Sequence, residues 1–273
     1  MKRRFEKMHG LGNDFVIFDA RDTPLEMTAA KARALADRRT GIGCDQLIVL
    51  EPSARADLRM RIWNADGGEV GACGNASRCV ALLLGGENTI ETAGGLIRAN
   101  AAAASATVDM GEPRFGWDEI PLAYPMDTAD MPVGWEDLKR PHGVNVGNPH
   151  VIFFVEDAGD IDLDRLGPVI ENDPLFPERV NVNLAEVLVG GINVDGVRRP
   201  GISLQVWERG AGLTQACGTG ACATAVAAIK YQGMTSPIGV RLPGGLLTIE
   251  WQPGETIRMT GAATHVFSGE VGL

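Results

Sequence analysis

One short pattern occurs twice in the chain, each time directly before an apolar run of small residues. The copies read ACGNASRCVALLL (72–84) and ACGTGACATAVAAI (216–229). Trp63 lies ten residues before Cys73 and Trp207 lies ten before Cys217, so both pairs share one offset, 207 − 63 = 217 − 73 = 144. Self-similarity over such a long period indicates a duplicated structural unit.

A second echo extends the repeat upstream. GNDFVIF (12–18) returns as GNPHVIF (147–153), and the offset 147 − 12 = 135 also relates Gln46 to Asn181. We therefore expect one copy from about residue 5 to 117 and another from about 142 to 262. Four prolines within 116–141 give that segment the composition of a linker.

Most of each copy has the character of short strands. The runs are rich in β-branched, leucine or aromatic residues and are bounded by turn residues. They are DFVIFDA, DQLIVLE, LRMRIW, VIFFVE, ISLQVW and LLTIEW. A helix is expected at about 28–38 with Thr28 as its cap, and 100–111 is expected to form a hairpin with an alanine-rich turn.

The two runs that follow the cysteines are predicted helices. They cover 75–84 and 219–232 and stop at glycines. Apart from Arg78 the first is apolar nearly all round, and the second is apolar until Lys230. A helix without a polar face is buried. The sequence therefore predicts an α+β fold of two pseudo-symmetric, β-rich, barrel-like halves, each wrapped around one central buried helix.

The buried helix starts indicate chemistry. A first turn has about four unpaired N–H groups, and its dipole favours an anion. Gly74 and Gly218 let a ligand approach that backbone, and a cysteine at such a terminus has a lowered thiol pKa. Two such thiols with a carboxylate between them suit inversion of an α-carbon, in which one thiolate removes the α-proton and the opposite thiol delivers another. Cys73 and Cys217 are the expected acid/base pair.

Composition excludes several other classes. A net charge of −10 argues against a nucleic-acid or anionic-membrane surface. No apolar run approaches the ~18 residues of a membrane span, and the basic N-terminus leads into no apolar signal region. Five cysteines without such a signal favour free thiols in a reducing cytoplasm. No closely spaced cysteine pair has zinc-ligand spacing, so no metal is expected.

Seven segments, in order from residue 7 to 223, resemble the diaminopimelate epimerase family. They are KMHGLGNDFVIFD, TGIGCDQ, NADGGEVGACGNASRC, VDMGEP, VGNPH, FPERVNV and WERGAGLTQACGTGACA. The resemblance implies that fold, with domains 1–117 and 118–262 and with 263–273 returning to the first. It also implies cofactor-independent interconversion of LL-2,6-diaminopimelate and meso-diaminopimelate by a thiolate/thiol pair, in lysine and peptidoglycan precursor biosynthesis.

The resemblance also implies site residues. Besides Cys73 and Cys217, it assigns an activity-related role to His150, which would order the site, and to Glu208. Its substrate contacts fall on Asn13, Gln46, Asn64, Gly74, Asn75, Asn148, Asn181, Glu208, Arg209, Gly218 and Thr219. An arginine with several amides suits a second carboxylate, and a carboxylate suits an ammonium group. A hydrogen-bonded core histidine is the other reading of His150.

Other functions stay open at this point. A proline racemase or hydroxyproline epimerase shares the two-cysteine logic, but this chain has Cys-Gly-Asn where those enzymes have Cys-Gly-His. An amino-acid-binding module without catalysis and a thiol redox sensor are further alternatives, and five lysines without a phosphate loop disfavour a pyridoxal-phosphate racemase. The expected partner is a small molecule; a homodimer is one possible oligomeric state that the sequence leaves undefined.

Overall fold

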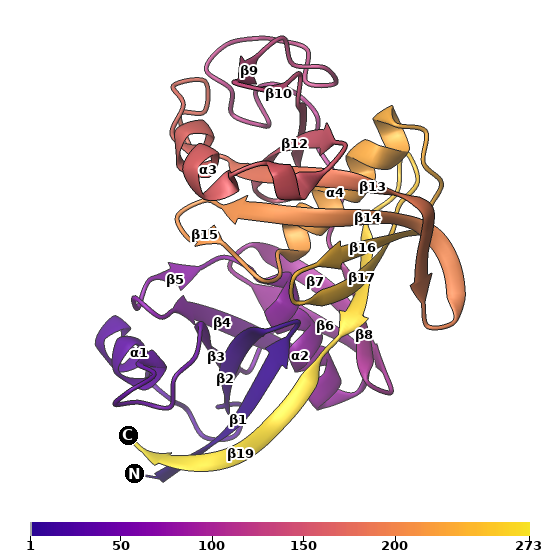
Figure 1. The fold of residues 1–273 in the computed structure, drawn as a ribbon. Helices are drawn as coiled ribbons and strands as arrows, with labels where there is room; N and C mark the ends of the chain where they lie inside the picture. Colours follow the sequence, from indigo (N-terminus) through magenta and orange to yellow (C-terminus); the bar gives the residue numbers. More distant parts are fainter. Residues whose placement is uncertain (1) are drawn as a thin grey trace. The chain divides into compact units, whose positions relative to one another are not determined.

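The structure is a computed structural model that describes residues 2–273. The chain divides into two compact units, one made of Met1–Asp109 with Thr260–Leu273 and the other of Met110–Met259 (Figure 1). The sequence predicted the corresponding boundaries at 117/118 and 262/263, and independent folding of these units stays a prediction. Each unit is β-rich around one central helix, which confirms the predicted fold class.

The first unit contains strands and two helices, and its N- and C-terminal strands pair with each other. Its elements are β1 (Lys2–Gly10), β2 (Asn13–Asp19), α1 (Ala29–Ala36), β3 (Gln46–Glu51), β4 (Leu58–Asn64), β5 (Glu69–Val70), α2 (Gly74–Leu84), β6 (Gly86–Thr92), β7 (Gly95–Ala102), β8 (Ser105–Asp109) and β19 (Thr264–Gly272). β19 runs antiparallel to β1 with Lys2 opposite Gly272, so the last strand of the chain pairs with the first (Figure 1).

The second unit repeats this plan with a longer central hairpin. Its elements are β9 (Gly134–Trp135), β10 (Leu138–Lys139), β11 (His142–Asn145), β12 (Pro149–Val155), the 3-10 helix η1 (Ala158–Asp160), α3 (Leu163–Glu171), β13 (Asn181–Val194), β14 (Val197–Glu208), β15 (Gly212–Leu213), α4 (Gly218–Tyr231), β16 (Ile238–Leu242) and β17 (Gly245–Glu250). β18 (Arg258–Ala262) spans the boundary between the units.

Strand registers show that the sequence repeat is a structural repeat. In the first unit β2 runs parallel to β3 with Phe15 opposite Gln46. In the second unit β12 runs parallel to β13 with His150 opposite Asn181. These are equivalent positions, because 150 − 15 = 181 − 46 = 135. The next antiparallel strands pair Leu47 with Trp63 and Val182 with Trp207, which again follow the offsets of the sequence repeat.

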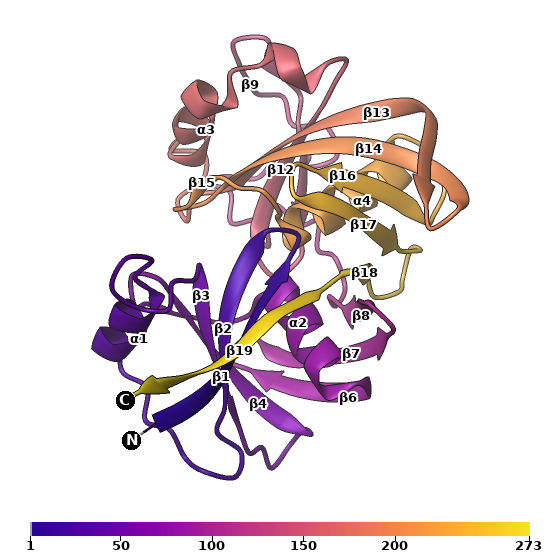
Figure 2. The ribbon, with the colours of Figure 1, turned by 60° about the horizontal axis from the view of Figure 1, so that its bottom comes forward.

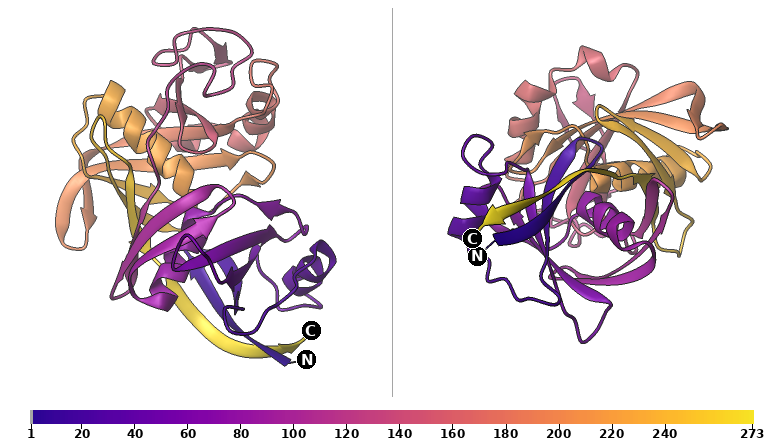
Figure 3. Two further views of the ribbon diagram at one scale, coloured as in Figure 1. Left: turned by 180° about the vertical axis from the view of Figure 1, so that it is seen from behind. Right: turned by 90° about the horizontal axis from the view of Figure 1, so that it is seen from below.

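The helices α2 and α4 form the centres of the two units. α2 contacts β1, β6, β7, β8 and β19 and is buried from Asn75 to Ala81 (Figure 2). α4 contacts β11, β12, β13, β14, β16 and β17, and its residues from Gly220 to Ala228 are buried. Both were predicted to within one residue at each end, because each apolar run stops at a glycine, and a helix with no polar face is buried. Two further views, from behind and from below, show each of these helices against the strands of its own unit (Figure 3).

Two smaller predictions are confirmed. α1 begins after Thr28, whose hydroxyl accepts a hydrogen bond from the Lys31 amide at 3.3 Å. The alanine-rich stretch forms the β7–β8 hairpin, in which Ala102 lies opposite Ser105.

The prediction that 116–141 is a linker is wrong. Ile120, Leu122, Met131 and Leu138 are all buried in the core of the second unit. The four prolines interrupt regular strands, but the apolar side chains between them still bury surface, and that burial stabilises an irregular lobe as well as a sheet. The proline content of 116–141 therefore indicates that the segment lacks regular backbone hydrogen bonding. It does not indicate that the segment lacks packing.

Candidate active site

In the first unit the predicted site residues gather at the start of α2. Cys73 caps the helix in an extended backbone conformation (φ −150°, ψ 113°) and is half-buried. Its Sγ lies 4.0 Å from Asn13 Oδ1, at the long limit for a sulfur hydrogen bond. The same Asn13 oxygen accepts a hydrogen bond from Asn75 Nδ2 at 3.2 Å. Three predicted residues therefore meet within one hydrogen-bonded cluster.

Charged neighbours fix the orientation of both amides in this cluster. Arg78, fully buried in α2, donates from Nη2 to Asn75 Oδ1 at 2.9 Å, and Asp45 accepts from Asn13 Nδ2 at 3.1 Å. Because arginine only donates and an ionised aspartate only accepts, each amide has one allowed orientation. Asn13 therefore turns its oxygen toward Asn75 and Cys73.

Asp45 is itself held by a charged cluster. Arg38 Nη2 bridges Asp45 Oδ1 at 2.7 Å and Asp14 Oδ1 at 2.6 Å, and Lys7 Nζ lies 2.5 Å from Asp14 Oδ2. The pKa of Asp14 lies well below its usual range: burial opposes ionisation, and the bonds from Arg38 and Lys7 outweigh it. Asp14 is thus held as an anion, and Arg38 links it to Asp45 behind Asn13.

Gln46 and Asn64 are adjacent on β3 and β4. Gln46 Nε2 donates to Asn64 Oδ1 at 2.8 Å. Gln46 Oε1 is buried and has no hydrogen-bond partner among residues 2–273. A buried acceptor without a partner has a free-energy cost of about 1–3 kcal/mol, which a bound donor would relieve.

In the second unit Cys217 lies at the start of α4 and is only 2% exposed. Its Sγ accepts a hydrogen bond from the Gly220 amide at 3.3 Å and lies 3.5 Å from Thr219 Oγ1. Burial and the negative charge of Glu208 raise the pKa of the Cys217 thiol well above its ordinary value, although both hydrogen bonds act in the opposite direction. The resting form is therefore the thiol. The expectation of a lowered thiol pKa at this helix start is wrong for Cys217, because burial and the Glu208 charge outweigh the hydrogen bonds at the helix terminus.

Glu208 is held at the end of β14. Thr214 Oγ1 donates to Glu208 Oε1 at 2.5 Å, and Glu208 also interacts with the Cys217 thiol. Burial raises the pKa of the Glu208 carboxyl, and these two hydrogen bonds lower it in part. Thr214 was not predicted, although its place between WERG and the second cysteine was a usable signal.

His150 is fully buried on β12, and both of its ring nitrogens are engaged within the second unit. Nδ1 lies 3.1 Å from Asn183 Nδ2 and Nε2 lies 3.0 Å from Asn148 Oδ1. Burial lowers the pKa of His150 to about 3, so the ring is neutral near pH 7. Asn148 in turn donates from Nδ2 to Thr219 Oγ1 at 3.3 Å.

Arg209 follows Glu208 in a turn that buried polar groups position. Its amide donates to Asn181 Oδ1 at 2.9 Å and its Nη1 donates to the Glu178 carbonyl at 2.8 Å. Glu171, from α3, accepts from Trp207 Nε1 at 2.7 Å and from the Gly210 amide at 2.9 Å. Sequence reasoning missed Glu171 because α3 carries no part of the repeated motif.

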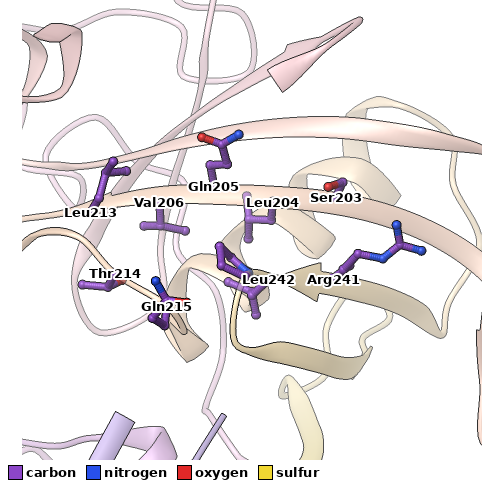
Figure 4. A pocket seen from close by; sticks show the side chains of 10 residues that line it. Ser203, Leu204, Gln205, Val206, Leu213, Thr214, Gln215, Arg241 and Leu242 are labelled. Atoms are coloured by element: carbon purple, nitrogen blue, oxygen red, sulfur yellow. The ribbon is translucent and has the colours of Figure 1, made fainter. Parts of the chain in front are cut away.

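A pocket of about 290 Å³ opens on the second unit beside the segment that leads to Cys217 (Figure 4). Ser203, Gln205 and Arg241 line it together with Thr214 and Gln215. None of the predicted site residues lines this pocket, although Thr214 contacts Glu208. The pocket is therefore separate from the predicted site.

Residues 2–273 contain no group of three or more His, Cys, Asp or Glu side chains arranged to hold a metal ion. Within the same range, no helix is long and apolar enough to cross a membrane. None of the cysteines, all of which lie within residues 2–273, forms a disulfide bond.

Fold comparison defines the class of protein. A phenazine biosynthesis protein of the PhzF family from Bacillus anthracis aligns over the full length of both chains with a TM-score of 0.71 at 16% identity. At that identity the likeness shows the fold alone. The chain thus has the two-unit fold of PhzF-like proteins and epimerases.

Sequence comparison defines the family. The profile of the diaminopimelate epimerase family matches residues 5–116 and 143–266. The chain is 64% identical over 274 residues to the diaminopimelate epimerase of Rhizorhabdus wittichii, covering 100% of this chain and 97% of the relative. It is 63% identical to that of Sphingopyxis alaskensis, covering 99% and 97%. The chain belongs to the diaminopimelate epimerase family and is an enzyme of the epimerase class, which confirms the resemblance found in the motifs.

Proposed function

We propose that the chain interconverts LL-2,6-diaminopimelate and meso-diaminopimelate without a cofactor, with Cys73 and Cys217 as a thiolate/thiol pair. The observation that carries this proposal is the repeat itself: two cysteines cap two buried helices at equivalent positions of two units with matching strand registers. A reaction that must add and remove a proton on opposite faces of one carbon requires two such groups.

The α-carboxylate of the substrate would bind the first turns of the two helices. α2 has 11 residues and α4 has 14, and both present backbone N–H groups at Gly74–Asn75 and Gly218–Thr219. The helix dipoles favour an anion there, and the same donors stabilise the charge that develops on the carboxylate when the α-proton leaves.

The proton transfers balance without a co-reactant. One cysteine thiolate takes the α-proton and becomes a thiol, the electron pair passes to the carboxylate as an enediolate-like carbanion, and the other thiol gives its proton to the opposite face. The pair ends with its protonation states exchanged, so the reverse reaction uses the same groups in the opposite order. Burial, together with the Glu208 charge, raises the pKa of the Cys217 thiol, which supports Cys217 as the proton donor and Cys73 as the thiolate in the resting enzyme.

The polar groups beyond the thiols would select the rest of the substrate. Arg209 supplies the guanidinium that would bind the distal carboxylate of the substrate. Glu208 and the side-chain amides of Asn64 and Asn181 suit the ammonium group of the substrate. The unpartnered Gln46 Oε1 adds one further acceptor for that group. A monocarboxylate such as proline would leave Arg209 without its partner.

The test is solvent-deuterium exchange by the purified chain, without added cofactor, on LL- and meso-diaminopimelate. The expected result is deuterium at the α-carbon together with formation of the other stereoisomer, and no exchange on proline. An active protein that exchanges proline but not diaminopimelate would overturn the assignment. Activity on diaminopimelate would place the chain in lysine and peptidoglycan precursor biosynthesis, as the family resemblance predicts.

A further inference from the structure

Asn183 is a fully buried asparagine on β13 that none of the sequence motifs singled out. Its Nδ2 lies 3.0 Å from the Val151 carbonyl oxygen and 3.1 Å from His150 Nδ1. Its Oδ1 faces the first turn of α4, where a Cβ added to Gly220 would lie only 2.7 Å away. Asn183 therefore lies between His150 of β12 and the first turn of α4.

The hydrogen-bonding groups around Asn183 fix its amide orientation. A backbone carbonyl can only accept, so the atom beside the Val151 oxygen must be the NH2 nitrogen. The Asn181 carbonyl oxygen, 3.4 Å away on the same side, requires the same orientation. The NH2 group then also faces His150 Nδ1, which must accept. A ring whose Nδ1 accepts is neutral and carries its proton on Nε2.

That tautomer orients the next two groups. Nε2–H of His150 donates to Asn148 Oδ1 at 3.0 Å, which turns the Asn148 NH2 group toward Thr219 Oγ1 at 3.3 Å. The Cys217 thiol is hydrogen-bonded to Glu208, and Thr219 Oγ1 accepts from Asn148, so the Thr219 hydroxyl hydrogen is left to be donated to Cys217 Sγ at 3.5 Å. Four side chains thus form one directed chain of donors.

We propose that Asn183 is a positioning residue that sets the His150 tautomer and, through Asn148 and Thr219, aims a hydroxyl donor at Cys217 Sγ. The inference rests on the function proposed above, in which Cys217 gives up and regains a proton. A donor at sulfur stabilises the thiolate and so opposes the burial and the Glu208 charge that favour the thiol. Cys217 can then release its thiol proton, which burial and the Glu208 charge otherwise retain.

The first unit has the opposite hydrogen-bond polarity at the equivalent position. Asn13 corresponds to Asn148, since 148 − 13 = 135, yet Asp45 turns its oxygen toward α2. Asn148 instead turns its NH2 group toward α4. The donor chain is therefore a feature of the second unit and not a consequence of the repeat.

The direct test is the ¹⁵N spectrum of the imidazoles in the full, folded chain. The chain has four histidines, and the His150→Gln variant identifies the resonances of His150. Between about pH 5 and 8, where an ordinary histidine titrates, we expect His150 to keep a protonated Nε2 and an unprotonated Nδ1. A protonated Nδ1, or a ring that titrates within that range, would overturn the proposal. This readout needs no substrate, so it is separate from any failure of the proposed function.

A variant tests the causal step. Asn183→Leu removes the donor to Nδ1, so the spectrum should gain the Nδ1–H tautomer while kcat falls about tenfold, the rate equivalent of one lost hydrogen bond. KM should change by less than kcat. Asn172→Leu, an exposed asparagine in the same unit, is the control and should leave both unchanged. If Asn183→Leu lowers kcat with no change of tautomer, Asn183 acts through packing only and the proposal fails.

Discussion

At the scale of single residues, the site combines groups that repeat with groups that do not. The cysteines and the glycines that follow them recur in both units, whereas Arg78 and Asp45 serve one helix start and His150, Asn183 and Glu208 serve the other. The repeated residues were predictable, because duplication marks them in the sequence. Asn183 and Asp45 were not, because only their contacts reveal what they orient.

Burial of neutral His150 has a consequence for stability. In the unfolded chain the His150 imidazole has its ordinary pKa of 6.5, whereas in the folded chain burial lowers its pKa to about 3. The contribution to stability is therefore complete above pH 6.5 and is lost as pH falls toward 3. Between pH 7.5 and pH 5 it should fall by about 2 kcal/mol.

Chemical denaturation at both pH values measures this effect. His150→Gln lacks the titration, so the difference in unfolding free energy between wild type and variant should narrow by about 2 kcal/mol at pH 5. Subtracting the variant removes the contribution of the carboxylates, which also lose stability on acidification. A difference that stays constant with pH would show that His150 is solvated or charged in the folded chain.

At the scale of elements, the two central helices were the most predictable parts and the lobe 116–141 the least. The long apolar runs that end at glycines predict α2 and α4 as helices without a polar face, and such helices are buried. The lobe has no period, so its buried Ile120 and Met131 could be recognised only in three dimensions. The local spacing of strands gave the β-rich class, but the matching registers of β2–β3 and β12–β13 needed the structure.

The first turn of α4 lies too close to β13 and β14 to accept a side chain at position 220. A Cβ there would meet Asn183 Oδ1 at 2.7 Å and Val206 Cγ2 at 3.1 Å. Replacing a helical glycine with alanine ordinarily stabilises by about 1 kcal/mol. Gly220→Ala should instead destabilise by about 1–3 kcal/mol, because the overpacked turn must shift.

The unfolding free energies of Gly220→Ala and of a control variant test whether position 220 tolerates a side chain. Gly272→Ala is the control, since a Cβ at Gly272 meets no atom within 4 Å. Gly220→Ala should also lower the epimerisation rate, because the Gly220 amide donates to Cys217 Sγ. If Gly220→Ala is as stable and as active as the control, the close packing of α4 on Asn183 is not a feature of the folded chain.

At the scale of the whole molecule, the duplication accounts for the proposed reaction. Two units of one plan each supply a buried helix start, a glycine-lined backbone and a thiol. The environments of these thiols differ, because Glu208 interacts with Cys217 whereas Asn13 lies beside Cys73. The two thiols therefore offer the same acid/base chemistry in different surroundings.

The central claim is that each thiol serves its own face of the α-carbon, and elimination of a hydrogen halide from a β-halogenated diaminopimelate tests it. This reaction needs only one base: the thiolate takes the α-proton and the halide leaves with its bonding electrons, so no second proton transfer occurs. Serine is too weak an acid to replace either thiol. Cys73→Ser and Cys217→Ser should both lose epimerisation, while Cys44→Ser, at a buried thiol in the core of the first unit, should retain it.

The measurement is the rate of halide release from each α-stereoisomer of that analogue by the two site variants. The account predicts that Cys73→Ser, which keeps Cys217, eliminates from one stereoisomer, and that Cys217→Ser eliminates from the other. The same stereochemical preference in both variants, or full epimerase activity in either of them, would contradict the account.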